Sequence, residues 1–179
     1  MKTWIALLRG INVGGHNILP MADLRRDLES LKLRNVRTYI QSGNVVFDST
    51  ARSPAPLAGK VARRIEQQHG FRPQVLVLKP EDLMTAIESN PFPTAVSDPA
   101  TLHFYFLSGP AVDPDTAALD RAKTSTERYE ITDAVFYLHA PDGIARSRLA
   151  ANVEKHLGVA ATARNFRTIE KIASMLAGR

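Results

Sequence analysis

The chain has 179 residues, of which 44% are hydrophobic and 23% charged, a composition typical of a globular protein with one domain or two small ones. It contains no cysteine, which excludes disulfides, thiolate metal sites and cysteine nucleophiles. The formal net charge is +5, and residues 145–179 carry seven basic and two acidic side chains. Such a basic stretch favours either contacts with phosphates or nucleic acid, or simply a solvated helix face.

The apolar run at the start of the chain ends at Arg9. It is therefore too short for a secretory leader, and no stretch approaches the roughly 20 apolar residues that a membrane helix needs. We expect a cytoplasmic protein that is not embedded in a membrane.

The first half of the chain predicts the order βαββαβ. Strand Thr3–Arg9 is apolar on both faces, so both faces should be covered. A glycine-rich loop follows, and Pro20 fits the first position of a helix. Strands Val36–Gln41 and Asn44–Asp48 then form a hairpin. A second helix follows and stops at Gly70, and Pro73–Lys79 is the fourth strand. This order is that of a ferredoxin-like unit.

Residues 80–100 predict a short helix and a proline-rich connection. The second half then repeats the pattern with a strand, a helix, a hairpin and a helix: Thr101–Ser108, Pro114–Lys123, Arg128–Thr132 with Ala134–Ala140, and Ile144–Leu157. No closing strand is evident, and the chain ends in an extra helix. We thus predict an α+β fold with antiparallel sheets and two ferredoxin-like halves, residues 1–79 (βαββαβ) and 101–179 (βαββα plus the extra helix). A sheet that is apolar on both faces must bury the second one, against the other half or in a homodimer.

The loop after the first strand is the first candidate site. Its glycines let the backbone turn sharply and approach a ligand, and the start of the next helix favours an anion. Its proposed ligand contacts are Arg9, Gly10, Asn12, Gly14, Gly15 and Asn17. The loop matches neither a Walker motif nor the dinucleotide pattern. The alternative is a loop that needs glycine only for its torsion angles.

The hairpin turn after the second predicted strand is the second candidate. It contributes Gln41, Ser42 and Asn44, although these residues are also ordinary in a tight turn. Ser42 lacks the setting of a nucleophile elbow. In a ferredoxin-like half, the loop after strand one and the turn between strands two and three leave the sheet at the same edge. We therefore expect the two candidates to converge.

The start of the last helix is the third candidate. Asn165 fits its N-cap, and Arg164 lies where a helix dipole disfavours a cation unless an anion is present. We expect these two residues to approach the loop at Arg9 and complete the site. The alternative is a capped helix with a solvated arginine.

The remaining polar residues indicate no catalytic centre. The histidines show no metal-ligand spacing, so we propose neither a metal nor a cofactor. The carboxylates, Asp27 among them, are expected on polar helix faces, so none is a candidate general base. The sequence leaves open whether the protein is an enzyme.

These motifs resemble those of the bacterial domain-of-unknown-function family numbered 1697. The segments that carry the resemblance are Leu7–Gly15, Met21–Arg25, Thr38–Phe47, Pro141–Leu149 and Thr162–Thr168. Phe166 stands where this family usually has tryptophan. The resemblance implies a tandem ferredoxin-like fold and supplies no activity.

Three hypotheses follow for the function. The leading one is binding, with turnover left open, of a small anionic or phosphate-bearing ligand at the edge formed by residues 10–17 and 41–44. The second is a nucleic-acid-binding module, since ferredoxin-like sheets can bind RNA through exposed aromatic residues. The third is a protein-interaction or scaffold protein.

Overall fold

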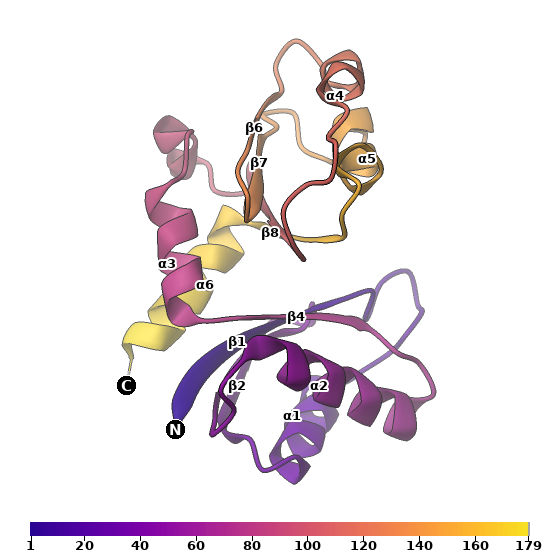
Figure 1. Cartoon of the computed structure of the whole chain (residues 1–179), viewed down its shortest axis with the longest axis vertical. Coiled ribbons are helices and arrows are strands. Elements are labelled where there is room, and N and C mark those ends of the chain that lie inside the picture. Colours follow the sequence, from indigo (N-terminus) through magenta and orange to yellow (C-terminus); the bar gives the residue numbers. More distant parts are fainter. Residues whose placement is uncertain (179) are drawn as a thin grey trace. The chain divides into compact units, whose positions relative to one another are not determined.

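The computed structural model describes residues 1–178, which form two compact units. The first unit comprises residues 1–84 together with 171–178, and the second comprises residues 85–170. Each unit contains a four-stranded antiparallel sheet with two helices on one of its faces (Figure 1). The predicted α+β fold with two ferredoxin-like halves is confirmed.

The first unit has the strand order β2-β3-β1-β4, with the outer strands separated by the central pair. Its elements are β1 (Lys2–Arg9), α1 (Met21–Ser30), β2 (Arg34–Tyr39), β3 (Asn44–Ser49), α2 (Pro54–His69) and β4 (Gln74–Leu78). As predicted, α2 stops at Gly70, which adopts the left-handed conformation with φ 76°.

The central strand β1 is buried on both faces. Trp4, Ala6 and Leu8 belong to the core that α1 and α2 cover. The alternate residues Ile5 and Leu7 point to the opposite face and are both 0% exposed. The expectation that both faces of this strand are covered is confirmed.

The second unit has the equivalent strand order β6-β7-β5-β8. Its elements are β5 (Leu102–Leu107), α4 (Thr116–Ala122), β6 (Arg128–Ile131), β7 (Val135–His139), α5 (Arg148–Leu157) and β8 (Ala161–Asn165). Helix α5 begins later than predicted, because the side chain of Ser147 caps it by accepting a hydrogen bond from Ala150 N.

The prediction that the second half lacks its closing strand is wrong. Strand β8 pairs antiparallel with β5, with Ala161 opposite Leu107 and Asn165 opposite His103. The strand reads Ala-Thr-Ala-Arg-Asn, so no apolar residue larger than alanine marks it. It lies at the edge of the sheet, where pairing needs backbone groups more than an alternating apolar pattern. The second unit is therefore a complete βαββαβ unit.

Three further elements lie outside the two βαββαβ repeats. They are α3 (Pro80–Glu88), the short 3₁₀ helix η1 (Pro93–Ser97) and α6 (Phe166–Ala177). The sequence assigned residues 80–100 to a connection, and α3 and η1 occupy that range. The division between the two units falls within α3, after residue 84, and within α6, after residue 170. No helix within residues 1–178 is both long and apolar enough to cross a membrane.

Asp27 of α1 is buried, which corrects the expectation that it lies on a polar helix face. One carboxylate oxygen lies 2.7 Å from His69 Nε2, and the other lies 3.3 Å from Arg64 Nε. Both partners belong to α2. A charge at this depth is tolerated because it is paired and hydrogen-bonded, and the cluster joins the two helices over the sheet.

Candidate functional site

The glycine-rich loop forms a small β-hairpin, which we call the finger (residues 10–18). Asn12 N donates to Asn17 O at 3.1 Å, and His16 N donates to Val13 O at 3.0 Å. Gly14 and Gly15 between them have φ 57° and 77°. A two-residue hairpin turn of type I′ requires positive φ at both central positions. The turn therefore explains these two glycines. The helix N-terminus invoked for an anion begins only at Met21, beyond the finger.

Asn12 fixes the finger to the rest of the unit. Its Nδ2 donates to Leu19 O at 3.0 Å and to Gln41 O at 2.7 Å, and its Oδ1 accepts from Leu19 N at 2.7 Å. Asn17 Nδ2 donates to Gly10 O at 2.7 Å and closes the base of the finger. Both asparagines have positive φ, a conformation that asparagine tolerates better than most residues.

The bond from Asn12 to Gln41 joins the finger to the β2–β3 turn (residues 40–43), as the topology predicted. Gly43 brings this turn against β1, because Leu8 N donates to Gly43 O at 2.8 Å. Gly43 has φ 76°, and an added Cβ would lie 2.6 Å from Leu8 Cβ and 2.9 Å from Ile11 Cδ1. Only glycine fits here, for both torsion and space.

Asn44, at the start of β3, is buried and engaged within the turn. Its Nδ2 donates to Tyr39 O at 3.1 Å and to Ser42 Oγ at 2.9 Å. The asparagines of the predicted site thus hold the two loops in place. Their structural role could not be distinguished from ligand binding by residue type alone.

Ile40 in the β2–β3 turn adopts an unfavourable backbone conformation. Its φ is 47°, and a β-branched residue in this left-handed region is a genuine outlier. The side chain is nevertheless 49% exposed, so burial of the side chain does not offset the strain. Strain of this kind, about 1–2 kcal/mol, is retained where the surrounding structure enforces it and is concentrated at functional sites.

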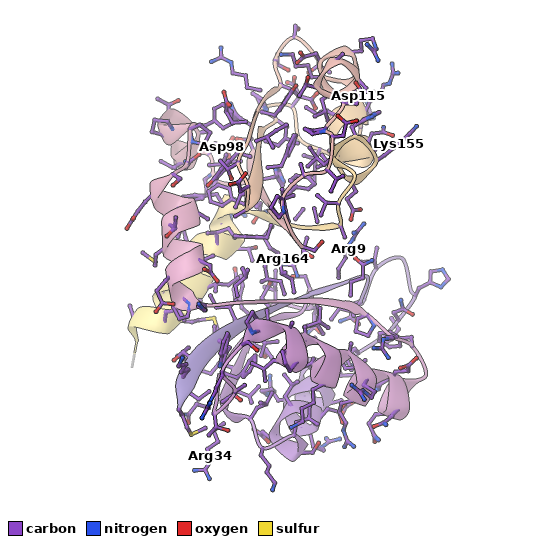
Figure 2. All side chains as sticks on the ribbon, in the orientation of Figure 1. Arg9, Arg34, Asp98, Asp115, Lys155 and Arg164 are labelled. Carbon is purple, nitrogen blue, oxygen red and sulfur yellow. The ribbon has the colours of Figure 1, made fainter. Side chains whose placement is uncertain are left out.

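Arg9 is the last residue of β1, and its side chain lies on the sheet face opposite α1 and α2 (Figure 2). Its Nη1 donates to Gln74 Oε1 at 3.2 Å, across the β1–β4 pairing that places these residues opposite each other. The residue is half-buried. A guanidinium group thus stands at the edge of the first sheet from which the finger and the β2–β3 turn emerge.

Arg164 and Asn165 lie on β8 of the second unit, and not in a loop before the last helix. Asn165 Oδ1 accepts from Thr168 N at 3.0 Å, which confirms its predicted role as the cap of α6. Arg164 is half-buried, and Nη1 donates to Ala163 O at 2.8 Å. Burial lowers the pKa of Arg164 to about 10. Its approach to Arg9 would join residues of different units and stays a prediction.

Exposed apolar side chains on the finger and turn were missed by the sequence analysis. Val13 is 67% exposed, Ile18 59% and Ile40 49%. The available signal was an apolar residue on either side of Gly14–Asn17, in a loop that no helix or strand could bury. Within residues 1–178 we find no group of three or more acidic or histidine side chains arranged to hold a metal ion.

The chain resembles proteins whose functions are not stated. The family described as "Protein of unknown function (DUF1697)" matches residues 1–137. A solved structure, the conserved bacterial protein SP0830 from Streptococcus pneumoniae, is 30% identical. The similarity covers 97% of this chain and 98% of the other, with a TM-score of 0.74. No curated protein matches the chain.

Proposed function

This chain belongs to the DUF1697 family of proteins of unknown function, and we propose that its finger and β2–β3 turn form a recognition surface for another protein. The observation that carries the proposal is the exposure of Val13, Ile18 and Ile40 on two loops joined by a side-chain hydrogen bond. Single exposed apolar residues are normal on a protein surface, but their concentration at one site favours binding.

The two loops are held in place before any partner arrives. Asn12 contributes three hydrogen bonds to this scaffold, and Gly43 packs the turn directly against β1. A preorganised surface loses less conformational entropy on binding than a flexible loop does. Fully burying one valine or isoleucine side chain contributes about 1.5–3 kcal/mol, so these side chains would supply part of the binding free energy of a larger interface.

The strained backbone of Ile40 supports the same proposal. A glycine or asparagine would fit φ 47° with less strain, yet this position carries an exposed isoleucine. An apolar side chain that is kept at a cost in folding free energy is explained if a partner buries it.

Photo-crosslinking in living cells tests the proposal with a matched control. A benzophenone amino acid replaces Val13 in one variant and Val112 in another, because these valines are 67% and 68% exposed in different units. We expect a discrete protein adduct from position 13 and none of that size from position 112. Adding Ile40→Asp should abolish the adduct, since an aspartate would be desolvated in an apolar interface. Equal adducts from both positions, or an adduct that Ile40→Asp leaves unchanged, would refute the proposal.

A small anionic or phosphate-bearing ligand is the second candidate, favoured by the position of Arg9 at this edge. Its guanidinium group lies beside Gln74, and charge-assisted hydrogen bonds to an anion are stronger than neutral ones. Arg9→Ala should then weaken binding of phosphate esters in calorimetry at least tenfold, whereas Arg34→Ala, at the far end of β2, should not (Figure 2). Equal affinities in the two variants would remove this candidate.

The nucleic-acid hypothesis gains no support from the central strands. Their aromatic residues are all buried: Trp4, Phe47, Phe104, Tyr105, Phe106, Phe136 and Tyr137. Recognition of RNA by such sheets uses aromatic rings that are free to stack on bases.

A further inference from the structure

The second unit carries a pocket of about 420 Å³ beside the β6–β7 hairpin. Its lining combines aromatic, cationic and hydroxyl side chains: Phe92, Thr94, Ser125, Thr126, Arg128, His139 and Pro141. All of these residues belong to the second unit, whereas the finger and the β2–β3 turn belong to the first. The pocket is therefore separate from the recognition surface proposed above, and its volume is within the range of small-molecule sites.

The pairing of β6 with β7 places Arg128 and His139 on one face of the sheet. The two residues lie directly opposite each other, and the next pair along the hairpin is Tyr129 with Leu138. Tyr129 and Leu138 pack in the core that α4 and α5 cover. Because successive side chains of a strand point to opposite faces, Arg128 and His139 lie on the face that these two helices leave uncovered.

Several polar groups of the pocket are free to bind a ligand. Arg128 and Ser125 are exposed, and His139 is half-buried. Within the part of the chain that the structure describes, none of these three side chains has a hydrogen-bond or ion-pair partner. A guanidinium group and a hydroxyl group both donate hydrogen bonds, so they can contact the oxygen atoms of one anion.

The charges at the pocket favour an anion. Arg128 carries a permanent positive charge, and none of the side chains that line the pocket is acidic. Two carboxylates are close in the sequence. Asp142 Oδ2 accepts a hydrogen bond from Thr126 Oγ1 at 2.7 Å, and Glu130 follows Arg128 by two residues on the same strand face. An arginine that neither carboxylate neutralises is suited to phosphate, which it binds in a bidentate manner.

An aromatic wall completes the pocket. The ring centroids of Phe92 and His139 lie 6.0 Å apart. The backbone at Phe92 is held in place, because Phe92 N donates to Asn90 Oδ1 at 3.0 Å and Phe92 O accepts from Ala95 N at 3.0 Å. Phe92 is only half-buried. Every nucleobase has a π-face that stacks on an aromatic ring, so a base is a suitable ligand for this wall.

We propose that this pocket binds a nucleoside monophosphate, whose base stacks on Phe92 and whose phosphate contacts Arg128 and the hydroxyl group of Ser125. The combination of groups carries the inference. An aromatic wall alone would fit any flat molecule, and an arginine alone would fit any anion. Both groups in one pocket select a ligand that joins a flat ring to a phosphate.

The test compares a whole nucleotide with its two parts. The full chain is titrated in a calorimeter with adenosine monophosphate, adenosine and ribose phosphate at constant ionic strength and pH. We expect saturable binding of the monophosphate and weaker binding of each part, because stacking and charge-assisted hydrogen bonds both contribute. Adenosine or ribose phosphate binding as tightly as the monophosphate would overturn the proposal. So would the absence of saturable binding with the adenosine, guanosine, cytidine and uridine monophosphates.

Substitutions in the second unit locate the site. Phe92→Ala should weaken binding about fivefold or more, and Phe92→Tyr, which keeps a ring, should bind like the unchanged chain. Arg128→Ala should weaken binding about tenfold or more. Arg121→Ala, which removes an exposed arginine from α4 of the same unit, is the matched control and should leave the affinity unchanged. Circular dichroism checks that each variant is folded.

Two results with these variants would contradict the inference. An affinity that Arg128→Ala leaves unchanged, or that Arg121→Ala lowers equally, excludes the phosphate contact. Equal affinities of Phe92→Ala and Phe92→Tyr exclude stacking of the base. None of the substituted residues belongs to the finger or its unit, so these measurements are independent of the crosslinking experiment.

Discussion

The loop that follows the first strand of each βαββαβ unit has a different partner in the two units. In the second unit, residues 108–115 lie on the end of α5, where Val112 N donates to Leu157 O at 3.0 Å and Asp115 N donates to His156 O at 2.8 Å. Gly158 permits this close approach, because an added Cβ would lie 2.7 Å from Val112 O. In the first unit, the finger bonds chiefly to itself and to the β2–β3 turn.

The chemistry of the two edges differs as well. The equivalent edge of the second unit carries the exposed carboxylates Asp113, Asp115 and Asp133. The first unit places Arg9 and exposed apolar side chains there. The same topology thus brings equivalent loops to the same end of each sheet. Whether the loop after the first strand packs against a helix or extends into solvent depends on the hydrogen-bond partners of its backbone.

The largest loss of stability is expected from Gly43→Ala, which disrupts the packing of the β2–β3 turn against β1. The new Cβ would lie 2.6 Å from Leu8 Cβ at φ 76°. We expect a loss of about 2–5 kcal/mol in the free energy of unfolding, from left-handed strain and overpacking together. Urea denaturation measures it.

Gly15→Ala is the control for that variant. Its φ of 77° matches that of Gly43, but an added Cβ would meet nothing within 4 Å. We expect the free energy of unfolding to fall by only about 1–2 kcal/mol, which is the strain of the left-handed backbone without overpacking. Equal losses in the two variants would show that the turn does not pack against β1 as described.

Asn12→Ala should have the next largest effect, because it removes the link between the finger and the turn. It leaves Leu19 N, Leu19 O and Gln41 O without their side-chain partner. We expect a loss of about 2–3 kcal/mol, against about 1 kcal/mol for Asp115→Ala, which removes only the cap of α4. Thermal unfolding of both variants measures the difference. An effect of Asn12→Ala no larger than that of Asp115→Ala would contradict the anchoring role.

Ile40→Gly should have the smallest effect on stability, and in the opposite direction. Relief of strain at φ 47° exceeds the entropic disadvantage of glycine, so the variant should be more stable by about 0.5–1 kcal/mol. Val112→Gly, in the loop packed on α5, removes no such strain and should be destabilising by a similar amount. Chemical denaturation distinguishes them, and a destabilised Ile40→Gly would argue against strain at this turn.

The fold was predictable wherever local patterns carried the information. The two-sided apolar strand Thr3–Arg9 and the stop at Gly70 led to the correct βαββαβ order. Strand β8 was missed because its pairing with β5 depends on backbone groups, and its small and polar side chains leave no pattern. Asp27 was misplaced because its partners His69 and Arg64 come from another helix, where no periodicity in α1 reveals them.

The meeting of the two candidate loops was predictable, but their contacts were not. Topology brings the loop after β1 and the β2–β3 turn to one edge, which is a property of the fold. The internal bonds of Asn12 and Asn44 depend on atomic distances that a motif does not contain.

The last helix has a consequence for how the chain acquires its structure during synthesis. Residues 171–178 of α6 belong to the first unit, although the whole second unit lies between them and residue 84. A ribosome adding about 5–20 residues per second completes the first 84 residues roughly 4–17 s before it reaches residue 171. The first unit therefore lacks residues 171–178 until the whole second unit has been synthesised, and a nascent chain interrupted within the second unit would lack this segment.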